Sequence, residues 1–193
     1  MKQLKLSDGE KLILLMLSEI HEHLQIKNGV DTKLVQSAIY SGNLWGLKWQ
    51  LTGVFHDHEA APEVIEEVVN VLDMWSFIES SYSRFSSDDK RMIEQEAKPF
   101  GQYVQFTGFD GNGEAEYISV ARFLVDDLER FSSFKGRELN SHLPSLDAHR
   151  RMLGVFNRLR PTLTSGLLTA TQVVELLKEK LHPERRSTAT AAH

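Results

Sequence analysis

Hydrophobic residues recur every three or four positions along most of the chain, which is the spacing of one face of an α-helix. The first such run extends from Leu12 to Leu24. It follows Ser7 and Glu10, whose spacing is that of a capping box, in which the two side chains satisfy free backbone N–H groups at a helix start. Apolar residues lie nearly all round this predicted helix, so we expect it to be deeply buried.

The same period predicts most of the remaining chain to be helical. Asp31 is placed to cap a second helix that Gly42 can end, and Pro62 is suited to the first position of a long one. Later helices are expected over residues 86–98 and 114–131, up to residue 159, and behind a second capping box at 169–172. Residues 103–106 alternate and could be briefly extended. The sum is an all-α fold of about seven helices with little or no strand.

Composition places this helical pattern in one ordinary globular domain. The chain has 193 residues, of which 41% are hydrophobic and 25% charged. We expect one compact domain over residues 1–181, followed by a flexible polar tail over residues 182–193. No apolar run reaches the ~18–20 residues of a membrane span, and the N-terminus does not read as a signal peptide. We therefore expect a cytoplasmic protein with no membrane partner.

The net charge of −5 is unevenly distributed along the chain. Residues 1–131 carry a net −10 and residues 132–193 a net +5. Such a split can mark a basic segment that contacts nucleic acid, or two parts that dock on each other or on another copy. We favour docking, because the basic residues at the C-terminal end are spread among apolar helical positions rather than clustered.

The glycine-rich stretch 108–114 is the most suggestive local motif. Its spacing matches no phosphate-binding loop. Asp110, Asn112 and Glu114 resemble the first positions of a calcium loop, but Ala121 stands where a bidentate Glu belongs. We expect a turn in which Asp110 or Asn112 caps the following helix.

Metal and nucleophile chemistry find little support in the sequence. With no Cys there are no thiolate ligands. His21 and His23 would point away from each other on a helix, and only the loop histidines His56 and His58 could hold an ion together. We expect no metal and no cofactor. No G-x-S-x-G elbow is present, although a triad assembled across the fold stays open, because triads are defined by geometry.

A cluster of polar residues surrounds the glycine-rich stretch. It comprises Asp110, Glu114, Arg122, Asp126, Arg130, Asn140 and Arg151. On one continuous helix, Arg122 and Arg130 would share a side, with Asp126 between them and paired to Arg130. One interpretation is a ligand site in which Asp110, Glu114, Arg122, Arg130 and Asn140 hold a small anion. The other, which we favour, is an ion network that fixes the helix against the loop at residues 140–144.

Two tryptophans, Trp45 and Trp49, stand four residues apart and would share one side of a short helix. They are either ordinary core or the centre of an oligomer interface, where Trp is enriched.

Several blocks of the chain have the residues and spacing of a known family. They are Leu12-Ile13-Leu14; Ser41-Gly42-Asn43 with Trp45, Leu47-Lys48 and Trp49; and Val104-Gln105-Phe106-Thr107-Gly108-Phe109-Asp110 with Glu114, Tyr117, Arg122-Phe123, Arg130-Phe131, Asn140, Pro144 and Arg151-Met152-Leu153. Over about residues 7–160 the chain resembles the YfbU-like family of uncharacterised bacterial proteins. The resemblance implies a helical fold and self-association, and it carries no catalytic assignment.

Three functions remain open on this sequence. The first, which we favour, is a non-enzymatic protein that forms a homo-oligomer and binds another protein. The second is an enzyme or binding protein for a small anionic ligand at the polar cluster. The third is a nucleic-acid-associated regulator whose residues 7–41 form a helix-turn-helix. The few basic residues there and the negative charge of the chain make a nucleic-acid partner poorly suited.

Overall fold

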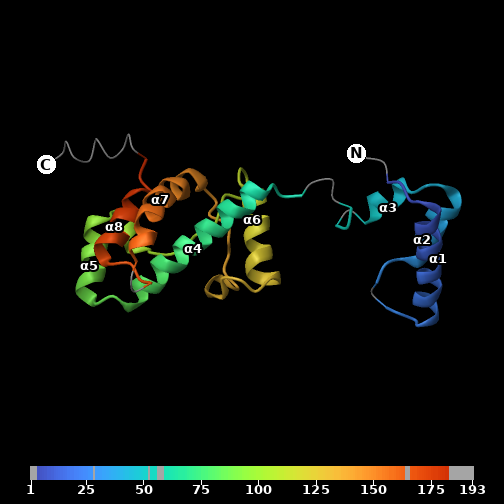
Figure 1. Ribbon diagram of the computed structural model, residues 1–193, viewed down its shortest axis with the longest axis horizontal. Coiled ribbons are helices and arrows are strands. Elements are labelled where there is room, and N and C mark those ends of the chain that lie inside the picture. The colour runs from blue at the N-terminus through green and yellow to red at the C-terminus, as the bar shows by residue number, and fades with distance from the viewer. Residues whose placement is uncertain (1–3, 28, 52, 56–58, 164–165, 183–193) are drawn as a thin grey trace. The chain divides into compact units, whose positions relative to one another are not determined.

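The structure is a computed structural model that describes residues 4–27, 29–51, 53–55, 59–163 and 166–182 (Figure 1). These residues form eight α-helices and no β-strand, apart from a single isolated bridge between Phe109 and Asn140. The all-α class is therefore confirmed. The contacts group the chain into two compact units, unit 1 (residues 1–59) and unit 2 (residues 60–193). The expected single domain over residues 1–181 stays a prediction, and residues 183–193 of the expected tail lie outside the described residues.

Unit 1 consists of three helices, α1 (Asp8–His23), α2 (Thr32–Ser41) and α3 (Trp45–Gln50). The expected capping box of α1 is present, because Ser7 Oγ accepts from the backbone N–H of Glu10 and the Glu10 carboxylate accepts from that of Ser7. Asp31 caps α2 through the backbone N–H of Leu34. Gly42 ends α2 in the left-handed region, with φ 73°. These local signals were enough to set the helix ends.

The core of unit 1 is small. Among its described residues, only Val35, Ala38 and Leu47 are buried hydrophobic residues, and six partly buried ones pack against them. The deep burial expected for α1 was wrong, because α1 turns Leu14 and Ser18 inward, leaves Leu15 partly buried and exposes most of its other apolar residues. The exposed set is Leu12, Ile13, Met16, Leu17, Ile20 and Leu24. Two short neighbouring helices do not cover every side of a sixteen-residue helix.

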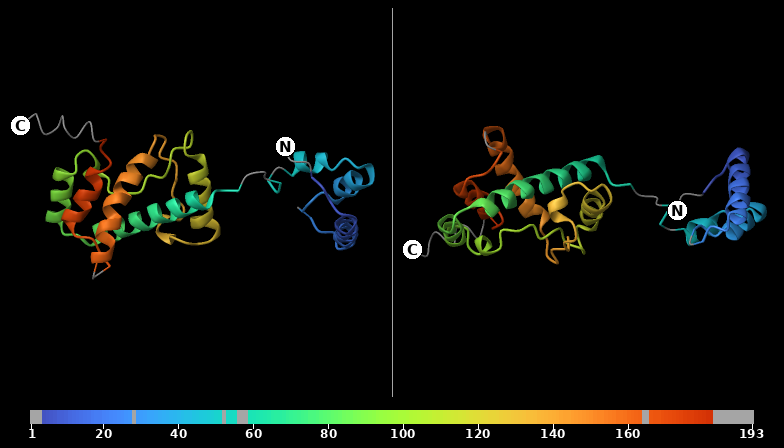
Figure 2. Two further views of the ribbon diagram at one scale, coloured as in Figure 1. Left: turned by 45° about the horizontal axis from the view of Figure 1, so that its top comes forward. Right: turned by 90° about the horizontal axis from the view of Figure 1, so that it is seen from below.

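Unit 2 is organised around α4 (Pro62–Arg84), which begins at the proline as expected. The other helices are α5 (Ser87–Glu96), α6 (Ala115–Arg122), α7 (Leu146–Leu159) and α8 (Ala170–Lys178). Contacts join α4 to α6, α7 and α8, while α5 packs against α8, and the views agree on this arrangement (Figures 1 and 2). Trp75 and Ile78 of α4 are fully buried, so α4 forms the centre of a continuous core.

Two local expectations differ from the structure. The helix predicted over residues 114–131 is regular only to Arg122, then widens into a π-helical turn over Phe123–Asp127. It ends before Glu129, whose φ of 52° is incompatible with a right-handed helix. Residues 103–106 form no strand; the backbone N–H of Phe106 donates to Glu79 of α4 instead. A hydrogen bond to a helix thus takes the place of the strand pairing that an extended segment would make.

Candidate functional site

The candidate site is built where two loops of unit 2, residues 108–114 and 139–146, meet side by side. The backbone N–H of Phe109 donates to the Leu139 carbonyl (3.1 Å), and that of Ser141 donates to the Phe109 carbonyl (2.9 Å). Gly108 makes this approach possible, because it has φ 93° and a Cβ there would overlap the Leu139 carbonyl. The glycine-rich stretch therefore serves close backbone contact.

Asn140 joins the two loops, and Asp110 stabilises the turn within its own loop. Asn140 Oδ1 accepts from the backbone N–H groups of Gly111 and His142, each at 3.0 Å. Asp110 is buried, and its Oδ1 accepts from the backbone N–H of Asn112 (3.2 Å). Both side chains thus bind backbone groups within the loops. This is the work of turn-forming residues, in which an Asx side chain replaces a missing backbone partner.

Glu114 caps α7, a helix that begins 32 residues later in the chain. Its carboxylate accepts from the backbone N–H groups of Asp110 (2.8 Å), Ser145 (2.9 Å) and Leu146 (2.8 Å), and from Ser145 Oγ (2.8 Å). Burial raises the pKa of Glu114, but these hydrogen bonds outweigh it and hold the pKa below its usual value. A carboxylate so occupied is ionised at neutral pH and poorly suited to accept a proton.

The expected capping of α6 was wrong. Neither Asp110 nor Asn112 caps it; the N-cap position is Glu114 itself, with no side-chain hydrogen bond to the helix start. The carboxylate is drawn instead to the free N–H groups at the start of α7, where the helix dipole also favours negative charge.

The two arginines of the predicted cluster do not form a clamp. Arg122 is exposed at the end of α6, and Arg130 is exposed beyond the π-helical turn. Within the described parts of the chain, no ion pair joins Arg130 to Asp126, because the regular helix ends before the four-residue spacing can take effect. Arg151 binds elsewhere, donating to the Glu179 and Lys180 carbonyls at the end of α8.

An open groove of about 500 Å³ lies beside the two loops. Its lining includes Gly111, Ser119, Arg122, Phe123, Asp127 and Asn140. Arg122 and Asn140, both predicted as ligand-binding residues, are therefore brought to one surface, and Arg130 does not line it. Asn140 Oδ1 already accepts from two backbone N–H groups. The amide nitrogen is therefore the part of this side chain that is left to donate a hydrogen bond to a ligand, as a second donor beside Arg122.

His149 is the polar centre of the core beneath the site. Trp75 Nε1 donates to His149 Nδ1 (3.3 Å), so the other ring nitrogen, Nε2, donates to the Gly108 carbonyl (3.2 Å). The rings of Phe106 and Phe109 lie 5.6 and 5.4 Å from the imidazole. Burial lowers the pKa of His149 to about 4. It is a neutral core histidine.

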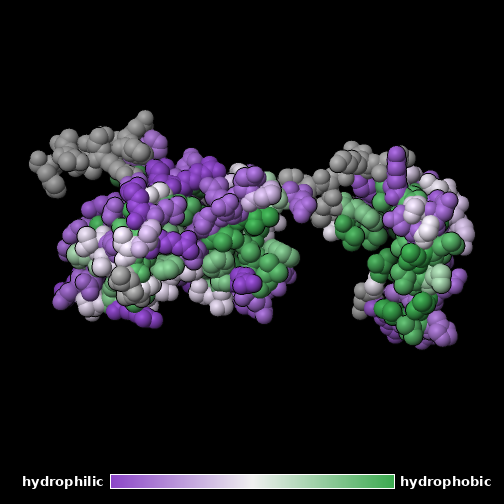
Figure 3. All heavy atoms as spheres, viewed as in Figure 1, coloured by the Kyte–Doolittle hydropathy of each residue, from purple (hydrophilic) through white to green (hydrophobic). Residues whose placement is uncertain are grey.

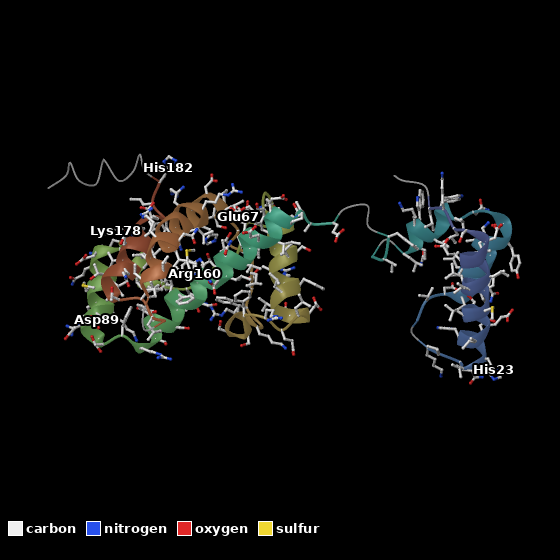
Figure 4. All side chains as sticks on the ribbon, in the orientation of Figure 1. His23, Glu67, Asp89, Arg160, Lys178 and His182 are labelled. Atoms are coloured by element: carbon white, nitrogen blue, oxygen red, sulfur yellow. The ribbon has the colours of Figure 1, made fainter. Side chains whose placement is uncertain are left out.

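Two ion clusters that the sequence did not suggest connect the helices of unit 2. Glu67 of α4, labelled in Figure 4, binds Arg150 of α7 through two hydrogen bonds (2.6 and 3.0 Å) and Tyr117 of α6 at 2.8 Å. The Arg150 guanidinium lowers the pKa of Glu67, although burial opposes it. Glu79 similarly receives two hydrogen bonds from Arg137. Only tertiary folding brings these partners together, across 50 to 83 residues of chain.

The described residues show neither a metal-binding cluster nor a membrane-spanning helix. They contain no group of three or more His, Asp or Glu side chains placed to hold a metal ion. The loop pair His56 and His58 lies outside them. No helix among them is long and apolar enough to cross a membrane.

These features define a class: an all-helical protein whose polar loops are satisfied from within and whose α1 displays an apolar face. A family model described as YfbU domain matches residues 4–177, and the chain belongs to that family. A UPF0304 protein from Methanocaldococcus jannaschii is 32% identical over 91 residues, which are 45% of this chain and 51% of that protein. The chain thus spans about half the length of this curated relative, and the expected family is confirmed.

Proposed function

We propose that this YfbU-family protein is not an enzyme and works by self-association and by binding another protein through unit 1. The exposed apolar face of α1 carries the proposal: its six large aliphatic side chains are each 52–63% exposed. On α3, Trp45 and Trp49 are 58% and 69% exposed, with their rings edge to face at 5.6 Å. Exposed apolar patches of this kind mark interaction sites in soluble proteins.

The acidic residues of the polar cluster support a non-enzymatic function, because their carboxylates already bind groups of the protein itself. Glu114 accepts four hydrogen bonds, and Asp110 is buried and bonded within its own turn. A general base needs a free lone pair aimed at a substrate and a pKa near the working pH. Glu114, with four hydrogen bonds and a pKa below its usual value, does not meet that description. Asp110 is buried and accepts from Asn112 of its own turn, so a structural role explains both acids.

Sedimentation velocity between 1 and 100 µM tests self-association. We expect a dimer or larger species, and we expect Trp45→Ala/Trp49→Ala to weaken it if α3 contributes to the contact. Tyr103→Ala is the matched control, because Tyr103 is an aromatic residue of unit 2 that is even more exposed than the two tryptophans. A chain that stays monomeric at 100 µM would contradict the proposal.

A second candidate function is binding of a small anion in the groove beside Arg122 and Asn140. The groove's size and its two donors, a guanidinium and an amide, favour a phosphate or carboxylate group. A thermal-shift screen with phosphorylated metabolites and nucleotides tests it, because a ligand of the folded state raises Tm. Stabilisation should disappear in Arg122→Ala and persist in Arg130→Ala. No shift with any compound would remove this candidate.

The remaining expectations are less well supported. Lys33 is the one basic residue within α2, so the helix-turn-helix alternative gains nothing from the structure. A cytoplasmic location continues to rest on composition, and the docking of the basic C-terminal residues stays a prediction.

A further inference from the structure

The exposed face of α1 has the register of a helix-pairing seam. Ile13, Leu17, Ile20 and Leu24 follow one another at steps of four, three and four residues, which is the spacing of coiled-coil core positions. Leu12 and Met16 widen the seam on one side. Leu14 and Ser18 lie on the other side of the seam from Leu12 and Met16, where Ser18 is buried and Leu14 packs on the core of unit 1. Within unit 1, this side of the helix is covered, whereas the described residues of unit 1 leave the seam exposed.

The area of this face fits an interface between two copies. Six half-exposed aliphatic side chains at ~100 Å² each present ~600 Å² per copy, so a pair would bury ~1,200 Å², the lower bound of a specific interface. In Figure 3, hydrophobic side chains gather over α1 on the visible face of unit 1. The small core of unit 1 gives an added reason to cover this face, because three buried hydrophobic residues leave its helices little to pack on.

The chemistry of the seam selects a second copy over other occupants. A face without charges can meet itself across a two-fold axis with no like charges opposed. Membrane-binding helices carry Lys and Arg on their polar side, whereas α1 carries Asp8, Glu10, Glu19 and Glu22 and a single lysine, Lys11. The same acids would repel nucleic-acid phosphates.

We propose that α1 pairs with α1 of a second copy along the Ile13–Leu17–Ile20–Leu24 seam, making a short two-stranded helix contact. This inference rests on the proposed self-association and specifies its contact surface. The seam excludes water in the dimer, and Leu17 and Ile20 are its two central residues.

The absence of Cys from the chain allows a direct test, because any introduced Cys is the only thiol. Under mild oxidation, Ile20→Cys should form a disulfide-linked dimer readily, since facing positions of paired helices come within disulfide range. Glu19→Cys, on the neighbouring side of the same helix, and Leu143→Cys, exposed in unit 2, are controls that should link slowly. Equal linking rates in all three would overturn the inference.

Sedimentation of Ile13→Gln/Ile20→Gln separates this inference from the proposed function. Both residues are exposed in unit 1, so helix content by circular dichroism should be retained, while the dimer Kd rises about a hundredfold or more. Leu143→Gln should remain dimeric. A double variant that associates like the wild type would overturn the α1 contact and leave self-association standing. A monomeric wild type would overturn both, as would a monomer that binds anionic phospholipid vesicles through this seam.

Discussion

Unit 1 and unit 2 are built from similar amphipathic helices, yet they differ sharply in how much apolar surface they bury. In unit 2, 26 buried hydrophobic residues form one core, drawn from α4 to α8 and the loops between them. In unit 1 the corresponding core has three. An apolar stripe on a helix is stable when another apolar surface covers it. In unit 2 the other helices and loops supply that surface, whereas the described part of unit 1 does not cover the apolar stripe of α1.

The polar interactions follow the same division. Unit 2 contains the buried His149 and Asp110, the four-fold capping by Glu114 and the ion clusters at Glu67 and Glu79. The buried polar residue of unit 1 is Ser18, which bonds to the Leu14 carbonyl of its own helix. Long-range polar bonds need a core around them, because burial is what strengthens them and makes their geometry unique.

The largest expected effect comes from opening the core of unit 2. Phe106→Ala should cost about 3–5 kcal/mol of unfolding free energy, because the ring is buried against Trp75, Phe134 and His149. Leu17→Ala on exposed α1 should cost far less in dilute protein. Urea denaturation of both variants measures the contrast, and equal costs would mean that the two units do not differ as described.

Dilution should affect unit 1 alone. If a second copy stabilises unit 1, a hundredfold dilution from a concentration well above the dimer Kd lowers the unfolding free energy of unit 1 by up to about 2.7 kcal/mol. Hydrogen exchange followed by mass spectrometry should then show faster exchange in α1 and α2 at 1 µM than at 100 µM. Amides of α4 are the internal control and should not change. Exchange in α1 that is independent of concentration would count against the dependence.

Removing the cap of α7 should produce an intermediate effect within unit 2. Glu114→Ala leaves the backbone N–H groups of Ser145 and Leu146 without their acceptor, at a cost of about 1–3 kcal/mol. Glu116→Ala, two residues away on α6, serves as a comparison. Urea denaturation measures both, and a Glu114 variant as stable as the wild type would show that water replaces the carboxylate without loss.

The stability of unit 2 should depend on pH through His149. Folded His149 takes up a proton only near pH 4, whereas the unfolded residue does so near its ordinary pKa of 6.5. Unfolding therefore binds a proton between these values, and the unfolding free energy falls as pH drops from 6.5 toward 4, by at most about 1.4 kcal/mol per pH unit. Denaturation at pH 7, 6 and 5 should show this slope, reduced in His149→Asn. An unchanged slope in the variant would assign it to other groups.

The smallest effect is expected at Arg130. Arg130→Ala should change stability by less than about 0.5 kcal/mol, because the side chain is exposed beyond the end of the helix. Arg137→Ala should cost more, since it removes both hydrogen bonds to Glu79. A large loss in the Arg130 variant, measured by thermal denaturation, would show that the predicted arginine cluster has a structural role after all.

Local sequence signals predicted the helices well and the candidate site only in part. The boxes at Ser7 and Thr169 and the proline at residue 62 set helix starts through contacts within four residues. The Asp110–Glu114 turn was also foreseeable. The partner of Glu114 was not, because the N–H groups it binds belong to a helix far along the chain.

Which apolar faces find partners could be read from the structure alone. Periodicity marks α1 as apolar nearly all round, and this same pattern led to the expectation of burial that proved wrong. The spacing of hydrophobic residues determines that a segment is helical and which of its faces is apolar, since both depend on neighbours three or four residues away. Burial depends on surfaces from distant segments meeting in space. In unit 2 they meet around α4. The described residues of unit 1 leave most of the apolar surface of α1 uncovered within that unit, and that is where we expect a second copy to bind.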